Sequence, residues 1–177
     1  MANSTLSGTD TLVYESSKSK IYHRWDTQLE RNVVLKILNY EFPTPADIER
    51  FHNEYDILAN VRAKGIRRVL RRTKEKNRHA LILEWVEGKN IREIFVNNAS
   101  MSDSERISAV LRVAVNLSQS LINIHQHNII HKDISPFNII VDGNQSDVQL
   151  IDFGLATTIN LKHAYSSSPT RLEGTLH

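Results

Sequence analysis

The sequence predicts an α+β fold with two lobes: a five-stranded lobe that contains one helix, followed by a mainly helical lobe. Three observations lead to this prediction. Short apolar and β-branched segments separated by polar turns fill most of the chain up to residue 87. One amphipathic helical pattern interrupts them, and a long helical pattern dominates after residue 102. A chain of 177 residues suits two such small lobes rather than two full domains.

The first three strands are predicted from short apolar and β-branched segments. Thr11–Tyr14, Lys20–Tyr22 and Val33–Leu38 are separated by polar turns. This spacing is typical of antiparallel strands joined by short connections. The small polar residues at the start of the chain favour a flexible N-terminus over residues 1–11.

A helix is predicted from Pro45 to about Arg62. Thr44 suits the N-cap, proline suits the first helical position, and Asp47 lies in the first turn, where the helix dipole favours an anion. Apolar residues recur at i, i+3 and i+4 spacing, which predicts one buried stripe with Glu54 at its edge. The stripe consists of Ile48, Phe51, Tyr55 and Leu58, widened by Ile57 and Val61.

Two further strands are predicted at Ile66–Thr73 and Ala80–Glu84. A short hinge is expected at Glu87–Lys89, where the pattern changes from strands to helices. The first lobe would therefore cover residues 12–87 and the second lobe residues 88–177.

A long helix in the second lobe is predicted from a capping box and a helical apolar pattern. Ser102 and Glu105 have the spacing of the capping box. The apolar residues that follow predict burial along one face of the helix. That face would consist of Ile107, Val110, Leu111, Ala114, Leu117, Leu121 and Ile124.

The composition excludes several classes of function. A formal net charge of +2 gives no global field toward nucleic acid or an anionic membrane. The absence of cysteine excludes a disulfide scaffold, a thiolate nucleophile and cysteine metal sites. No apolar run approaches the roughly 20 residues that span a bilayer. We expect a cytoplasmic protein with no nucleic-acid partner and no membrane insertion.

Two groups of residues allow other interpretations. The basic stretch between Arg67 and Lys76 could contact a phosphate backbone, but it has no interleaved aromatic residues, which favours a solvated strand. His125, His127 and His131 could suggest a metal cluster. No further histidine or carboxylate completes a ligand set at a familiar spacing, so ordinary loop histidines are favoured.

The strongest chemical signal is the segment His131–Asn138, HKDISPFN, followed by the DFG segment Asp152–Gly154. Phosphoryl transfer from ATP spreads charge over the phosphoryl oxygens, so an enzyme needs cations, oxygen ligands for them and a carboxylate beside the incoming hydroxyl. Asp133 is expected to orient or deprotonate that hydroxyl. Asn138 and Asp152 are expected to hold Mg²⁺, because hard oxygen ligands suit this ion.

In these two motifs the chain resembles the protein kinase superfamily, whose HRDxxxxN and DFG elements occur in the same order with suitable spacing. Lys36 lies in VVLKIL, which looks like the family's VAIK strand, and Glu54 follows eighteen positions later. The resemblance implies a catalytic ion pair between Lys36 and Glu54, with Lys36 also binding the α- and β-phosphates of ATP. His131 is expected to pack beside the catalytic loop. The resemblance covers roughly Val13–His177.

The resemblance also implies a bilobal protein-kinase-like fold, an adenine site and a substrate class. The segment LILEWV looks like the strand that runs into the hinge, where backbone groups of Glu84 and Val86 would bind adenine and Leu83 would be the gatekeeper. Pro136 and the segment Glu173–Leu176 look more like the serine/threonine class than the tyrosine class. The implied function is ATP- and Mg²⁺-dependent phosphoryl transfer to serine or threonine residues of proteins.

The chain departs from the family at the loop between the first two strands. Residues Glu15–Tyr22 contain no glycine, although glycine permits a close backbone approach to phosphates. Ser17 and Ser19 are expected to bind the ATP phosphates in part through their hydroxyl groups, with Lys18 or Lys20 adding positive charge. Similar loops occur in kinase-like domains that begin large bacterial sensor proteins.

Two further departures affect charge. Lys132 stands where the family has an arginine, and a lysine cannot clamp a phosphorylated activation loop in the bidentate way. Ser135 stands where serine/threonine kinases usually carry a lysine that touches the γ-phosphate. We therefore do not expect phosphorylation of the activation loop to regulate the protein. We expect the transition state of phosphoryl transfer to be less well stabilised than in kinases that carry this lysine.

The chain ends at His177, before the family's APE element and remaining helices. We therefore expect apolar surface that is left exposed and that a protein partner or further domains of a longer protein would cover. The partner would be a protein substrate or a regulatory protein. We also expect the chain to bind ATP but to transfer little phosphate. Two alternatives stay open. One is a nucleotide-binding pseudokinase or interaction module without turnover. The other is a small-molecule kinase of the aminoglycoside phosphotransferase type, against which the DFG followed by Glu-Gly-Thr argues.

Overall fold

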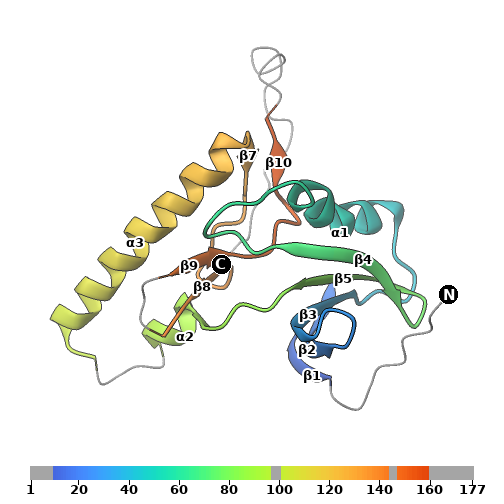
Figure 1. Ribbon diagram of the computed structural model, residues 1–177, viewed down its shortest axis with the longest axis horizontal. Helices are drawn as coiled ribbons and strands as arrows, with labels where there is room; N and C mark the ends of the chain where they lie inside the picture. Colours follow the sequence, from blue (N-terminus) through green and yellow to red (C-terminus); the bar gives the residue numbers. More distant parts are fainter. Residues whose placement is uncertain (1–9, 97–100, 144–146, 160–177) are drawn as a thin grey trace. The chain divides into compact units, whose positions relative to one another are not determined.

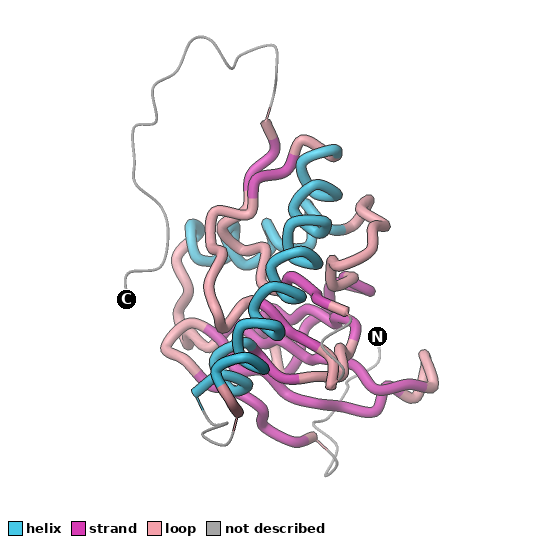
Figure 2. Tube along the Cα trace, turned by 90° about the vertical axis from the view of Figure 1, so that its left-hand side faces the viewer, coloured by secondary structure: helices cyan, strands magenta, loops and turns pink. Residues whose placement is uncertain are grey.

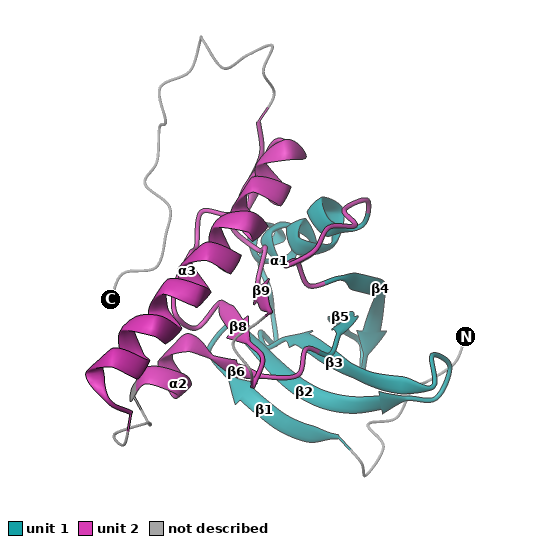
Figure 3. Ribbon diagram, turned by 60° about the vertical axis from the view of Figure 1, so that its left-hand side comes forward, with its two compact units in different colours: residues 1–59, 68–85 teal, residues 60–67, 86–177 magenta. Residues whose placement is uncertain are grey.

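The computed structural model describes residues 10–96, 101–143 and 147–159 (Figure 1). Most of the predicted flexible N-terminus and the predicted end of the activation segment, Glu173–Leu176, lie outside the described residues. The chain forms two compact units, residues 1–59 with 68–85 and residues 60–67 with 86–177 (Figure 3). The units interleave along the sequence, whereas the predicted lobes are continuous, so the lobe boundaries stay a prediction.

The first unit is built on a five-stranded antiparallel sheet in the order β1-β2-β3-β5-β4, which confirms the predicted strands. The two central strands, β3 and β5, are rich in Val, Ile and Leu because both of their faces are buried. The strands are β1 (Thr11–Glu15), β2 (Ser19–Asp26), β3 (Arg31–Leu38), β4 (Val69–Glu75) and β5 (Arg78–Glu84).

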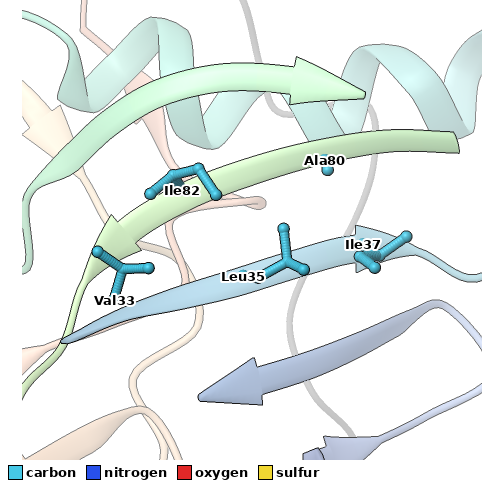
Figure 4. Packing of buried hydrophobic residues seen from close by; sticks show 5 residues of the cluster. All are labelled: Val33, Leu35, Ile37, Ala80 and Ile82. Carbon is cyan, nitrogen blue, oxygen red and sulfur yellow. The ribbon is translucent and has the colours of Figure 1, made fainter. Parts of the chain in front are cut away.

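Alternate side chains of β3 and β5 form an apolar cluster on one face of this sheet (Figure 4). Cross-strand pairing places Leu35 opposite Ile82 and Ile37 opposite Ala80, and paired residues of an antiparallel ladder share a face. Each large side chain buried here contributes about 1.5–3 kcal/mol. Because side chains alternate along a strand, Lys36 lies on the opposite face. The cluster consists of Val33, Leu35, Ile37, Ala80 and Ile82, with Tyr22 and Leu70 packed against it.

Helix α1 (Pro45–Leu58) begins at the predicted cap. The Thr44 hydroxyl accepts the N–H of Asp47 at 3.2 Å, and the Asp47 carboxylate accepts the N–H of Thr44 at 3.0 Å. The helix ends four residues before the predicted Arg62, because residues 60–67 leave this unit and join the second one. Its buried residues are Phe51, Glu54 and Leu58.

The described residues of the second unit form two helices and two small sheets. Figure 2 shows the helices of the protein in cyan and its strands in magenta. The helices are α2 (Ile91–Val96) and α3 (Asp103–Gln126), and α3 has the predicted capping box at Ser102. One sheet has the order β6-β8-β9, and β7 pairs with β10. The strands are β6 (Lys89–Asn90), β7 (Ile129–Ile130), β8 (Ile139–Val141), β9 (Val148–Leu150) and β10 (Thr157–Thr158).

The buried face of α3 is not the predicted one. Ile107 and Leu111 are 60% and 61% exposed. Part of the buried face is small, because Gly65 approaches Ser120 so closely that a Cβ at position 65 would clash with the serine hydroxyl. This close approach leaves no room for a large side chain at position 120. Of the predicted face only Ile124 is fully buried, and the buried residues are Ala109, Val113, Ser120 and Ile124.

Helix α3 is also, within the part of the chain that the structure describes, the one helix long and apolar enough to cross a membrane by length and composition. The helix contains no continuous apolar run of that length, because polar residues are scattered through it. A core helix of a soluble protein can have the same length and composition. Length and composition therefore do not decide whether α3 is a core helix or a membrane-spanning helix.

Candidate active site

The structure brings Lys36 and Glu54 together in the first unit. Lys36 on β3 donates from Nζ to Glu54 Oε2 on α1 at 2.7 Å. Lys36 is 6% exposed and Glu54 is 1% exposed. A charge removed from water to this degree requires an opposite charge and further hydrogen bonds, so each residue supports the other.

Helix geometry explains why an acidic residue is buried here. Glu54 follows Phe51 by three residues and precedes Leu58 by four, so the three side chains share the inward face of α1. On the strand side, Lys36 lies between Ile21 and Leu81 of the neighbouring strands. The sequence pattern predicted Glu54 at the edge of the buried stripe, whereas the structure places it within the stripe, between Phe51 and Leu58.

A second polar contact joins α1 to the sheet, and sequence patterns did not indicate it. His52 Nε2 and His79 Nδ1 on β5 lie 2.9 Å apart, within hydrogen-bond distance. Burial, followed by the charges of His79 and Arg72, holds the pKa of His52 below its usual range, while Asp56 acts in the opposite direction. Arg72 on β4 also lies over the Tyr55 ring, 4.9 Å from its centroid.

The loop between β1 and β2 carries the predicted phosphate-binding serines. Ser17 is exposed and Ser19, the first residue of β2, is half-buried. The N–H of Ser19 donates to Ser16 Oγ at 3.1 Å, so this amide is engaged within the loop. The binding role of both serines stays a prediction.

The predicted adenine-binding residues lie on either side of the division between the units. Glu84 is the last residue of β5 and donates its N–H to the carbonyl of Arg68 at 2.9 Å. Leu83, the expected gatekeeper, is buried, and Val86 belongs to the second unit. Their contacts with adenine stay a prediction.

In the second unit, Asp133 and Asn138 are joined on one loop. The Asn138 Nδ2 group donates to Asp133 Oδ2 at 2.9 Å and to the Asp133 carbonyl at 3.0 Å. The N–H of Asn138 donates to the Ser135 carbonyl at 3.0 Å, which closes the turn between them. Because the amide nitrogen holds the carboxylate, the amide oxygen is the group of Asn138 that suits a metal ligand.

Asp152 is held beside this loop by backbone contacts. The N–H of Ile151 donates to the Asn138 carbonyl at 3.0 Å, and Gly154 N–H lies 3.3 Å from Asp152 Oδ1. Asp152 has a φ of 62°, a left-handed conformation that aspartate tolerates better than most residues. Local strain of this kind is concentrated at functional sites.

His131 has the packing role that the sequence predicted. It is 1% exposed, and its Nε2 lies 3.1 Å from the Ile151 carbonyl. Its ring meets the buried Phe153 ring edge to face at 4.5 Å between centroids. These contacts link the HKD and DFG segments through their interior residues. Lys132, with a φ of 63°, is exposed between His131 and Asp133.

The donor set of this loop fits magnesium. Asn138 and Asp152 offer amide and carboxylate oxygens, and the backbone bond from Ile151 to Asn138 keeps their positions together. Over the described ranges no group of three or more His, Cys, Asp or Glu side chains gathers to form an all-protein metal cage. A site with one or two protein oxygens that leaves positions for phosphate and water suits Mg²⁺.

Comparison with known proteins identifies the family of the chain. A family model described as the protein kinase domain matches residues 15–176. The serine/threonine-protein kinase PrkC of Bacillus subtilis is 26% identical over 143 residues, which cover 80% of this chain and 21% of that protein. A probable serine/threonine-protein kinase of Clostridium perfringens is 29% identical over 174 residues, covering 92% and 25%. The serine/threonine-protein kinase PknL of Mycobacterium tuberculosis is 28% identical over 142 residues, covering 80% and 34%.

The chain thus spans about a fifth to a third of the length of these curated relatives. The family model nevertheless covers almost all of its sequence and includes both charged clusters described above. The chain belongs to the protein kinase family.

Proposed function

We propose that the chain binds ATP with Mg²⁺ and transfers the γ-phosphoryl group to serine or threonine hydroxyls of a protein. One observation carries the proposal: the Asn138 amide holds the Asp133 carboxylate at 2.9 Å, next to the strained backbone at Asp152. Family membership supports the reaction class, and the names of the relatives support the substrate class.

Each charged residue has a separate role in this proposal. Asp133 orients the substrate hydroxyl and accepts its proton. Lys36, fixed by Glu54, binds the α- and β-phosphates. Asn138 and Asp152 hold Mg²⁺, which neutralises charge that develops on the phosphate oxygens.

A second function, nucleotide binding without turnover, is favoured by Ser135. This residue is buried, 6% exposed, and stands where serine/threonine kinases usually carry a lysine. A cation lost from the γ-phosphate slows transfer more than it weakens binding, because the transition state carries charge on the transferred group. We therefore expect slow transfer.

Transfer of label from radiolabelled ATP to a generic protein substrate tests the proposal. Asp133→Asn removes the basic carboxylate but keeps an oxygen for the Asn138 amide, so the loop should stay intact. We expect a loss of transfer of about a hundredfold to ten-thousandfold. Asp147→Asn, which changes a half-buried carboxylate directly before β9, is the matched control. Wild-type transfer that Asp133→Asn leaves unchanged would contradict the assignment, and ATP binding with no transfer would favour the second function.

A further inference from the structure

The loop between β1 and β2 closes through the side chain of Ser16. Its Oγ accepts the N–H of Lys18 at 3.2 Å and the N–H of Ser19 at 3.1 Å, while the Ser16 N–H donates to the Ser19 carbonyl at 2.9 Å. A serine hydroxyl that binds following amides stabilises a tight turn. None of the described residues with positive φ lies in this loop, so its conformation does not require glycine.

Asn39 attaches this loop to the end of β3. Its Nδ2 donates to the Ser16 carbonyl at 2.8 Å, and its N–H donates to the Lys18 carbonyl at 2.9 Å. Asn39 follows the last residue of β3, three positions after Lys36. The two bonds therefore fix the loop to the strand that carries the proposed phosphate-binding lysine.

These contacts determine what the loop can offer an anion. The amides of Lys18 and Ser19 are engaged by Ser16, so they do not serve as phosphate donors in this conformation. Lys20 pairs with Glu15 at 2.9 Å. Lys18 and Ser17 are both exposed. The charge of Lys18 also acts on Asp47, whose pKa is lowered chiefly by the hydrogen bonds of Thr44 and to a smaller degree by Arg50 and Lys18.

We propose that Ser16 and Asn39 are positioning residues that hold Ser17 and Lys18 toward the terminal phosphates of a nucleoside triphosphate. The inference rests on the proposed nucleotide-binding function and adds how a loop without glycine contributes to it. A loop ordered before binding loses less conformational freedom when the phosphates arrive. Lys18 then supplies the positive charge, and Ser17 supplies the hydroxyl and the amide.

The test compares dissociation constants of ATP·Mg²⁺ and of adenosine, measured by isothermal titration calorimetry on the full chain. Asn39→Ala, which removes one side-chain hydrogen bond, should weaken ATP binding by about three- to tenfold. Ser16→Ala, which removes the two bonds that Oγ accepts, should weaken it at least as much. Adenosine binding should change less than about twofold, because adenosine has no phosphates. Ser16→Thr, which keeps the hydroxyl, should bind ATP like the wild type. Asn123→Ala is the matched control, since it removes an Asn-to-carbonyl bond of 2.8 Å in the second unit.

The possible results separate this inference from the proposed function. If the wild-type protein bound neither ATP nor adenosine, both the proposed function and the positioning role would be overturned. Variants that bind ATP like the wild type, or that weaken ATP and adenosine equally, would overturn the positioning role alone. Amide hydrogen exchange gives a measurement without ligand: the Lys18 and Ser19 amides should be protected in the wild type and exchange faster in Ser16→Ala. Equal exchange in both proteins would also contradict the closed loop.

Discussion

The ion pair of the first unit and the catalytic loop of the second hold their functional groups in different ways. Lys36 and Glu54 lie on a strand and a helix, eighteen residues apart, and both are almost excluded from solvent. Asp133 and Asn138 lie five residues apart on one loop, and both are half-buried. The first geometry depends on how a helix packs on a sheet, whereas the second depends on the local backbone.

This difference separates stability from activity. A buried pair whose partner is removed leaves an uncompensated charge in a poorly solvated place, so the unit should lose much of its stability. A half-buried loop contact can be replaced by water, so its loss should impair function at a small cost in stability. The contacts that hold α1 are thus predicted to be structural as well as functional.

The largest expected effect follows from breaking the buried pair. Lys36→Met leaves the Glu54 carboxylate without its lysine and should lower the free energy of unfolding by about 3–5 kcal/mol. The double variant with Glu54→Gln should lose much less than the sum of the two single changes, because it removes both charges. Urea denaturation measures all three variants.

Lys64→Met is the matched control, because Lys64 is exposed and pairs with Asp147 only at 3.9 Å. It should change stability by less than about 0.5 kcal/mol. Strict additivity of the Lys36 and Glu54 substitutions would show that the two charges do not support each other.

A smaller effect on stability is expected at Asn138. Asn138→Ala removes the amide that holds Asp133 and should lower the free energy of unfolding by about 1 kcal/mol. Transfer of label from ATP should nevertheless fall strongly, because the carboxylate loses its fixed position. A loss of stability as large as that of Lys36→Met would remove the distinction between the two units.

The smallest expected effect concerns pH and His52. Its pKa is lower in the folded protein, so the unfolded chain takes up a proton first as the pH falls. The stability that His52 contributes is therefore fully present above its pKa in the unfolded chain. It should be lost as the pH falls through that pKa toward the lower pKa of His52 in the folded protein. His52→Gln should lose less stability than the wild type between about pH 8 and about pH 5.5. Urea denaturation at both pH values measures this difference.

His125→Gln is the control for that experiment, since His125 is an exposed residue in the last turn of α3. It should show the same pH dependence as the wild type. An identical pH dependence in His52→Gln would mean that the burial of His52, with the nearby charges of His79 and Arg72, does not couple protonation to folding.

The sequence predicted the elements of the first unit well because each prediction rested on a local signal. The N-cap residue Thr44 and the apolar run around Lys36 are such signals. The prediction of the buried face of α3 was wrong. Apolar residues occur around much of this helix, so periodicity does not say which face packs against the rest of the unit. The close approach of Gly65 to Ser120 decides that face, and it joins residues far apart in sequence.

The contacts around the candidate site show the same limit. The pair of Lys36 with Glu54 was expected because both belong to recognisable motifs, whereas the bond between Asp133 and Asn138 was not, although one motif contains both residues. The contact between His52 and His79 joins a helix to a strand through two residues that no motif marks. The bond from Asn39 to the β1–β2 loop was missed for the same reason.

The central claim is that the loops of the second unit hold magnesium with a nucleotide, and Asp152→Asn tests it most directly. Asparagine tolerates the left-handed backbone at this position and keeps an oxygen for the Gly154 N–H, so the fold should survive. ATP at about 100 times its dissociation constant should stabilise the wild type by about 2.7 kcal/mol in the presence of Mg²⁺. Thermal unfolding with and without ATP and Mg²⁺ should show most of this gain lost in Asp152→Asn and retained in Asp147→Asn. An equal Mg²⁺-dependent gain in the wild type and Asp152→Asn would contradict the claim.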